Sequence, residues 1–225
     1  MTAIVIASDG RMNIVLQNLA HLTTMGEVFM TVSRREEQET IRTKFREVNV
    51  EVVPNIPLGR KWQMALDMAR KKNPEIVVIC GSDDILCNEY IANACKFLDK
   101  GFHFIGTSAW FMTDGKTHYS TKYKVMREFP AGSGRVMTHK CLEMINWNVF
   151  DTTANRRLDD KLLSMISTRG IKKYVSQEPE KDGLNVLALK GQWIQLNPIN
   201  KFLNVPSIDC RKIEYLPLDF PHIEF

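Results

Sequence analysis

The stretch Ile76-Val77-Val78-Ile79-Cys80-Gly81-Ser82-Asp83-Asp84-Ile85-Leu86 decides how the rest of this chain is interpreted. Its first five residues are apolar, which is typical of a fully buried strand over 76–80. A glycine, a serine and two adjacent carboxylates, Asp83 and Asp84, follow directly. Because the carboxyl ends of strands in an open α/β sheet form the edge where ligands bind, the two acids are expected at a binding site.

Two physical roles fit these adjacent acids. Neighbouring carboxylates repel each other unless positive charge lies beside them, and Mg²⁺ or Mn²⁺ with a substrate phosphate would supply it, since hard cations take oxygen ligands. Alternatively, Asp83 or Asp84 caps a helix over 85–99 by accepting backbone N–H bonds. These residues alone leave both roles open.

The first half of the chain alternates strand and helix patterns. We predict strands at 2–8, 27–33, 50–53 and 76–80, and helices at 12–24, 34–47 (with Ile41 and Phe45 facing inward) and 60–72. This βαβ alternation predicts a parallel sheet, in which strands 3–8 and 76–80 end at the same edge. The second half predicts strands at 102–110 and 123–127 around a turn at 113–116, a flexible segment at 131–134, helices at 139–146 and 158–169, and a wrapping tail broken by prolines.

The composition indicates a soluble globular chain. Its 225 residues are 44% hydrophobic, which suits one domain with a sizeable core. The net charge of +4 suits an anionic substrate but is too weak to indicate nucleic-acid binding. We find no apolar run of the roughly 18 residues that span a bilayer, and no signal peptide. Five cysteines without a CxxC spacing indicate reduced thiols, so a cytoplasmic location is expected.

Four places carry groups suited to a phosphorylated ligand, although each also has an ordinary structural explanation as a turn, a solvated helix start or a helix cap. They are Ser8-Asp9-Gly10-Arg11, Gly59-Arg60-Lys61, Ser82-Asp83-Asp84 and Asp159-Asp160. An arginine favours phosphate in a fork geometry, and cations at a helix start favour anions.

In their order along the chain, these residues resemble the motifs of family-2-like glycosyltransferases. Residues 79–86 resemble the segment F-L-D-S-D-D-I-L, residues 55–65 resemble N-x-G-x-x-x-A-x-N, and residues 4–11 resemble V-V-I-P-T-Y-N-R. Gly132-Ser133-Gly134-Arg135-Val136-Met137 and Leu158-Asp159-Asp160 stand where the family has its acceptor segment and its E-D motif. The resemblance runs from about residue 3 to residue 169.

The resemblance implies a fold and a reaction. The fold is a GT-A-like three-layer α/β sandwich with a mostly parallel central sheet, shared by a nucleotide-binding half (about 1–100) and an acceptor half with a C-terminal tail (about 101–225) in a single domain, 1–225. The reaction moves a sugar from a nucleoside diphosphate sugar, expected to be UDP-linked, to a hydroxyl acceptor such as a glycan.

The resemblance also implies roles for individual residues. Asp83 would bind Mn²⁺ or Mg²⁺, and Asp160 or Asp159 would be the catalytic base of an inverting reaction. The donor would be bound by the remaining residues of the four places, which are Ser8, Asp9, Arg11, Gly59, Arg60, Lys61, Ser82 and Asp84. The candidates for a further metal ligand are His222 and the segment 181–185, and the candidate sugar platforms are Trp110, Trp147 and Trp193. One departure stands out: Gly81 replaces the first acid of the family's motif, so Ser82 would take over part of its ribose contact.

Two other classes of function stay open. The basic stretches 60–61, 70–72 and 122–124 would suit the same chemistry on a modified base of a nucleic acid. A non-catalytic nucleotide-sugar-binding module, or a nucleotidyltransferase with a similar α/β half, would use many of the same residues.

Overall fold

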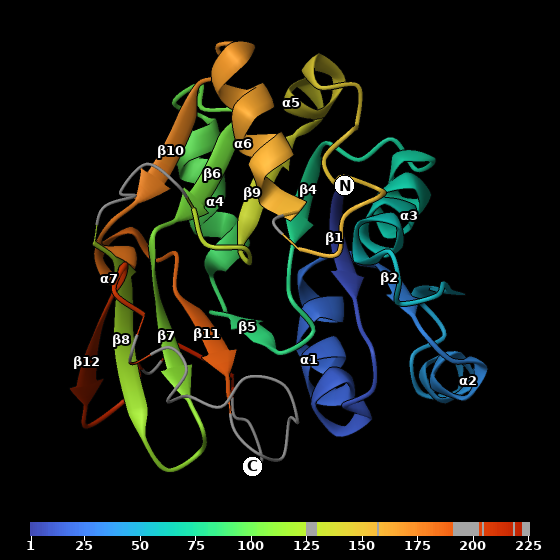
Figure 1. Ribbon diagram of the computed structural model, residues 1–225, viewed down its shortest axis with the longest axis horizontal. Coiled ribbons are helices and arrows are strands. Elements are labelled where there is room, and N and C mark those ends of the chain that lie inside the picture. Colours follow the sequence, from blue (N-terminus) through green and yellow to red (C-terminus); the bar gives the residue numbers. More distant parts are fainter. Residues whose placement is uncertain (125–129, 157, 191–202, 204, 218, 222–225) are drawn as a thin grey trace.

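A seven-stranded sheet forms the centre of the fold, with a five-stranded sheet next to it (Figure 1). The computed structural model describes residues 1–124, 130–156, 158–190, 203, 205–217 and 219–221, without the side chain of residue 159. The larger sheet has the order β10-β6-β9-β4-β1-β2-β3. Its strands are β1 (Thr2–Ala7), β2 (Glu27–Val32), β3 (Asn49–Val52), β4 (Ile76–Ile79), β6 (Phe104–Thr107), β9 (Arg135–Thr138) and β10 (Lys173–Ser176).

The predicted βαβ alternation of the first half is confirmed. Strands β1 to β4 pair in parallel, and β6 pairs in parallel with β10, whereas β9 is antiparallel to both β4 and β6. The helices are α1 (Met12–Met25), α2 (Arg35–Lys44), α3 (Leu58–Arg70), α4 (Tyr90–Leu98), α5 (His139–Met144), α6 (Leu158–Thr168) and α7 (Pro179–Asp182).

Alternating side chains of the central strands divide the core into two layers. Ile4 and Ile6 of β1 belong to a cluster that includes buried residues of α1, α2 and α4. Ala3 and Val5, which point to the opposite face, pack in a second cluster with buried residues of α3, α5 and α6. The central sheet is therefore covered by helices on both faces, as the resemblance to GT-A-like transferases implies.

The smaller sheet, which the sequence did not predict, has the order β12-β8-β7-β11-β5, whereas the central sheet is shared by both halves as expected, with β1 to β4 from the first half and β6, β9 and β10 from the second. Its strands are β5 (Asp84–Leu86), β7 (Ala109–Thr113), β8 (His118–Tyr123), β11 (Val186–Leu189) and β12 (Ile208–Ile213). A third apolar cluster joins this sheet to α1, since Ile14 packs with Ile85, Phe111, Leu187 and Leu189.

The predicted helix 85–99 is wrong over its first residues. Asp84–Leu86 form β5, which pairs antiparallel with β11, and α4 begins only at Tyr90 with Glu89 as its N-cap. Neither Asp83 nor Asp84 therefore caps this helix, so that structural explanation of the acid pair is removed.

The predicted strand 102–110 is divided between the two sheets at Ser108. The Thr107 hydroxyl donates a hydrogen bond to the carbonyl of Ala109, and the Ser108 N–H donates to the carbonyl of Ser176. Such local bonds compete with regular pairing, so the chain passes from β6 in one sheet to β7 in the other. The predicted turn at 113–116 is confirmed as the β7–β8 hairpin, and the strand lies at His118–Tyr123 instead of 123–127, of which residues 125–127 fall outside the described part.

The tail returns to the body of the fold. Strand β12 pairs with β8, and Asp219 accepts hydrogen bonds from the Asn88 N–H and from Asn185 Nδ2. None of the helices in the described ranges combines the length and the apolar character that a membrane span requires.

We expect Trp147→Ala to lower the free energy of unfolding by about 3–5 kcal/mol, because this side chain is only 1% exposed and packs in the apolar cluster below α3 and α5. Tyr215→Ala is the matched control, since Tyr215 is 76% exposed and a surface change costs at most about 0.5 kcal/mol. Chemical denaturation of the two variants measures the difference, and equal losses would contradict a purely structural role for Trp147.

Candidate active site between the two sheets

A cavity of about 450 Å³ lies between the central sheet and the smaller sheet. Its walls come from the end of β4, the segment after it, β11, and the residues before β9 and α6. The lining residues are Leu58, Trp62, Ile79, Gly81, Asp83, Asp84, Trp110, Tyr123, Ala131, Gly132, Ser133, Phe150, Asn155, Arg156, Leu158, Val186, Ala188 and Lys190. Asp83 and Asp84, the adjacent acids that follow β4, therefore line the cavity together with side chains from the second half of the chain.

Aromatic pairs line part of this cavity. Trp62 stacks on Phe150 with ring centroids 5.4 Å apart, and Trp110 lies 5.0 Å from Tyr123 in a tilted arrangement. Of the candidate sugar platforms, Trp110 lines the cavity, whereas Trp147 is buried in the core away from the cavity lining. Trp193 lies outside the described residues. Aromatic faces of this kind suit the apolar faces of a sugar ring.

Asp83 lies between two cations. Its Oδ2 is 3.4 Å from Arg11 Nη1 and 3.2 Å from Lys190 Nζ. Arg11 also donates from Nη2 to the Ser82 hydroxyl at 3.1 Å. The residues that follow β1 and those that follow β4 therefore lie together as predicted, because β1 and β4 are neighbours and end at the same edge of the sheet.

The Asp84 carboxylate lies against the backbone of Gly81, three residues earlier in the chain. A Cβ atom built on Gly81 would overlap the Asp84 carboxylate, so a residue with a side chain at position 81 would collide with it. The Gly81 N–H donates to the Ser133 hydroxyl at 2.9 Å, which fixes the glycine-containing segment against β4. Burial, and then the neighbouring Asp83, raise the pKa of Asp84 above its usual range.

The glycine-containing segment 131–134 is held in place, contrary to the expectation of flexibility. Besides the Ser133 contact, the Gly134 N–H donates to the Ile79 carbonyl at 2.8 Å, and the Tyr90 hydroxyl donates to the Gly134 carbonyl at 2.5 Å. Gly134 has φ +76°, a conformation that favours glycine. The segment therefore forms a fixed wall of the cavity.

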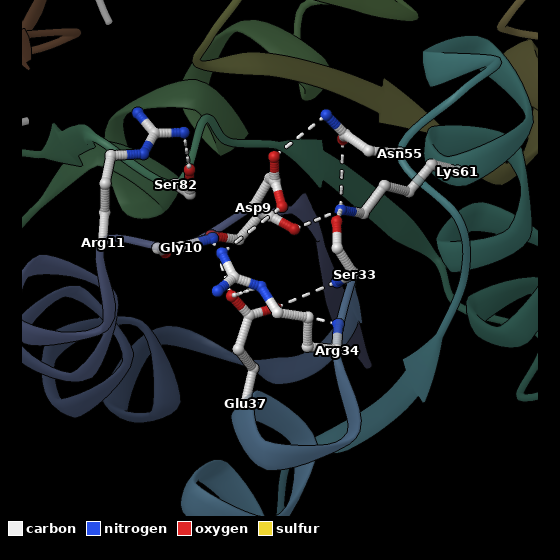
Figure 2. A network of polar contacts seen from close by, with 10 residues as sticks. Asp9, Gly10, Arg11, Ser33, Arg34, Glu37, Asn55, Lys61 and Ser82 are labelled. Atoms are coloured by element: carbon white, nitrogen blue, oxygen red, sulfur yellow. Dashed lines mark hydrogen bonds and ion pairs between the residues drawn. The ribbon is translucent and has the colours of Figure 1, made fainter. Parts of the chain in front are cut away.

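A polar network continues the site along the carboxyl ends of β1, β2 and β3, as Figure 2 shows. Asp9 accepts a hydrogen bond from Asn55 Nδ2 at 3.1 Å, and Asn55 Oδ1 accepts one from Lys61 Nζ at 3.3 Å. Lys61 also donates to the Ser8 carbonyl and, at 2.6 Å, to the Ser33 hydroxyl. The predicted donor-binding residues Ser8, Asp9 and Lys61 therefore belong to one connected group.

Sequence reasoning missed Glu37, which ties the loops after β1 and β2 together. Its Oε1 accepts from the Gly10 N–H at 2.8 Å, and its Oε2 accepts from the Ser33 N–H at 3.0 Å and the Arg34 N–H at 3.1 Å (Figure 2). Glu37 is the third residue of α2, the position at which a glutamate reaches back to the helix start, and that spacing was the available signal.

Lys61 is fully buried rather than displayed at the surface of the helix start. It lies four residues before Ala65, on the face of α3 that packs on the sheet. Burial lowers the pKa of Lys61 to about 8, and the carboxylates of Asp9 and Glu37 oppose this change. Its contacts position the loops after β1, β2 and β3.

Gly59 and Arg60, which the sequence grouped with Lys61 as a candidate phosphate-binding place, do not share its contacts. The Gly59 N–H donates to the Ala154 carbonyl at 2.9 Å, and a Cβ on Gly59 would overlap the backbone of Asp151. Gly59 thus allows α3 to approach the segment that enters α6. Arg60 is exposed.

The predicted catalytic acids lie at the start of α6. Leu158, the first residue of this helix, lines the cavity, whereas Asp160 is exposed and is not among the lining residues. The side chain of Asp159 falls outside the description. The helix start therefore borders the cavity.

Lys190 is the second residue of the candidate site that sequence reasoning missed. It follows the buried strand β11, as Arg11 and Asp83 follow β1 and β4, and that position was its only signal. The neighbouring segment 181–185 does not reach the cavity: Asp182 accepts hydrogen bonds from Tyr174 and Ser176. His222 lies outside the described residues.

A resident divalent metal at Asp83 does not fit this arrangement. An ion on Asp83 Oδ2 would lie next to two positive charges, because Arg11 and Lys190 both contact that oxygen. Within the described ranges, no three His, Cys, Asp or Glu side chains gather closely enough to hold a metal ion. Because Mg²⁺ beside a substrate phosphate is commonly held by only one or two carboxylates, the pairing of Asp83 with two cations is the observation that argues against a resident ion.

Comparison with known proteins gives similarity at the level of the fold. No family model matches the chain, and no curated protein matches it. Among solved structures, S. aureus TarS 1–349 has a TM-score of 0.58 at 12% identity over 86% of this chain and 61% of that one. The same fragment in complex with UDP-GlcNAc has a TM-score of 0.59 at 14% identity, covering 84% and 58%, and its complex with UDP has 0.54 at 13%, covering 84% and 60%.

This chain therefore spans about three fifths of the TarS fragment. At such low identity the similarity establishes the fold alone. Together with the strand order and the three layers, it shows that the fold is GT-A-like, as the motifs implied.

We expect the stability of the protein to depend on pH through Lys61. Its pKa falls from 10.5 to about 8 on folding, so between these values the unfolded chain binds more protons. The free energy of unfolding should thus rise with pH across this window. Relative to Lys61→Met, the wild type should gain about 2 kcal/mol between pH 7 and pH 10. Denaturant unfolding at both pH values measures this gain, and parallel pH dependences of the two proteins would contradict it.

We expect Gly81→Ala to lower the free energy of unfolding by about 1–3 kcal/mol, because the new Cβ displaces the Asp84 carboxylate. In the Asp84→Ala background the same change should cost little, since the colliding group is gone. A double-mutant cycle measures this coupling. Additive effects of the two substitutions would show that Asp84 does not occupy the space above Gly81.

Proposed function

We propose that the protein is a glycosyltransferase that moves a sugar from a nucleoside diphosphate sugar, with UDP as the expected nucleotide, to a hydroxyl group of a glycan or another acceptor. The observation that supports this most directly is the cavity between the sheets. Acids and cations line one part of it and aromatic side chains another, in a GT-A-like fold.

The donor side of the proposal rests on the edge formed by β1, β2 and β4. Arg11 and Lys190 present positive charge there, and Asp9 is half-exposed at the neighbouring loop with Asn55 beside it. Charged donors suit a diphosphate, and a carboxylate with an amide suits the polar edge of a nucleotide. TarS, which has a similar fold, was solved with UDP-GlcNAc and with UDP.

The acceptor side rests on the aromatic part of the cavity and on the start of α6. Trp110 and Tyr123 would stack on an acceptor or donor sugar. In an inverting reaction, Asp160 or Asp159 would take the proton of the acceptor hydroxyl as its oxygen attacks the anomeric carbon. The Mn²⁺ or Mg²⁺ implied by the motif resemblance is left out of this proposal, because Asp83 is paired with two cations.

A thermal-shift panel of nucleoside diphosphate sugars tests the donor class. We expect UDP-linked sugars at about 100 times their Kd to raise Tm by roughly 5 °C or more, because ligand binding to the folded state adds about 2.7 kcal/mol. Uridine, which lacks the diphosphate, is the control and should produce a much smaller shift. If no nucleoside diphosphate sugar shifts Tm under any condition, the proposed donor class is wrong.

Product formation separates an enzyme from a binding module. With a candidate acceptor present, the wild type should release free nucleoside diphosphate, and Asp160→Asn should retain the thermal shift while turnover falls by about 100-fold or more. A stable complex with the donor sugar and no product from any acceptor tested would favour the binding module.

A further inference from the structure

We propose that Arg11 and Lys190 bind the donor diphosphate and neutralise the departing nucleoside diphosphate themselves, so that transfer proceeds without a divalent metal, and that Asp83 positions these two cations. This inference rests on the proposed function and concerns the same site. It assigns to two side chains the charge neutralisation that the motif resemblance assigns to a metal.

The first support is the arrangement of the three side chains. Arg11 and Lys190 approach the same carboxylate oxygen of Asp83, at 3.4 Å and 3.2 Å. Their side chains are only 14% and 9% exposed; Lys190 lines the cavity, and Arg11 lies behind Asp83, which also lines it. Two long side chains fixed in this way lose little further conformational freedom when an anion binds, which favours binding.

The second support is the backbone framework that holds these groups. The Leu189 N–H donates to the Asp83 carbonyl at 2.8 Å, and the Lys190 N–H donates to the Thr113 carbonyl at 2.7 Å. Lys190 is therefore tied both to the segment after β4 and to β7. The distance between the two cations is set by elements of both sheets.

The third support is the local structure of Arg11. This residue has φ +57°, an unfavourable conformation for a long side chain, and it is the N-cap of α1. Its Nε is buried and finds no hydrogen-bond partner among the described residues. A guanidinium with an unused donor, at the positive end of a 14-residue helix, is well suited to a phosphate oxygen.

The fourth support is the balance of charge. Asp83 and Asp84 supply two carboxylates, and Arg11 and Lys190 supply two cations in direct contact with one of them. A divalent ion on Asp83 Oδ2 would have to displace both cations, and an ion on Oδ1 of the same carboxylate would still lie close to both positive charges. A diphosphate instead offers new oxygen acceptors to cations that are already in place.

The transfer step is balanced without a metal. The acceptor oxygen forms a bond to the anomeric carbon while the bond from that carbon to the β-phosphate oxygen breaks. The electron pair of the broken bond stays on the phosphate oxygen, and the proton of the acceptor hydroxyl passes to the base. The departing nucleoside diphosphate gains one negative charge, which develops next to Arg11 and Lys190.

Titration calorimetry with UDP tests the proposal, first in EDTA and then with Mn²⁺. We expect UDP to bind the wild type in EDTA with an affinity that Mn²⁺ does not improve. Lys190→Met should weaken binding by roughly 10- to 100-fold, and Arg11→Asn, which tolerates the left-handed backbone, should do the same. Lys190→Arg should restore most of the affinity. Lys140→Met is the charge-matched control, because Lys140 is exposed in α5, where the neighbouring His139 N–H donates to the Glu75 carbonyl at the amino end of β4.

Asp83→Asn gives opposite results for the two mechanisms. If the cations bind the diphosphate, this variant should bind UDP in EDTA about as tightly as the wild type, because an amide oxygen still accepts from both cations and keeps them in position while a competing carboxylate charge is gone. If Asp83 holds a metal, the wild type should bind UDP only with Mn²⁺ and the variant should lose that binding. The second pattern overturns the inference and leaves the glycosyltransferase proposal intact.

Two further outcomes are informative. UDP binding in EDTA that neither Lys190→Met nor Arg11→Asn weakens would also overturn the inference. Failure of UDP and of every UDP-linked sugar to bind, with and without Mn²⁺, would instead remove the proposed donor class. Unfolding curves recorded without ligand show whether each variant is folded. If Lys190→Met does not fold, Arg11→Asn and Lys190→Arg still test the role of the two cations.

Discussion

The contact of Asp83 with Arg11 and Lys190 is the interaction on which the site depends. The three residues follow β1, β4 and β11, so the contact joins the central sheet to the smaller sheet at the edge of the cavity. Loss of either cation would leave a partly buried carboxylate with less compensation, which is costly in a setting of low polarity. The position of the smaller sheet and the electrostatics of the site are therefore coupled.

The parts of the fold that the sequence predicted are those that depend on local patterns. Strands β1 to β4 and helices α1 to α3 follow from apolar runs and helical periodicity, and Ile41 is buried on α2 as its spacing predicts. The start of the predicted helix 85–99 was wrong because Ile85 pairs with Leu187, which lies about a hundred residues further along the chain. No local window contains that partner, and β5 is too short to show a period.

The same limit applies to the site. Arg11 and Asp83 meet as predicted, because adjacent parallel strands deliver their following residues to one edge. Lys190 was missed since it reaches that edge from the smaller sheet, whose order the sequence does not reveal. Lys61 was expected to face an anion, yet its spacing from Ala65 already placed it on the inward face of α3, and this signal could have been used.

The departure at Gly81 acquires a physical explanation from the structure. The family's motif has an acid at this position, whereas here the absent side chain leaves room for Asp84 to turn back from the strand that follows. The Asp84 carboxylate lies next to position 81 in the cavity. Because Asp84 is the first residue of β5, its position depends on the pairing of β5 with β11. The same strand β11 is followed by Lys190, the partner of Asp83. A single strand of the smaller sheet thus holds one acid in place and is followed by the cation that contacts the other.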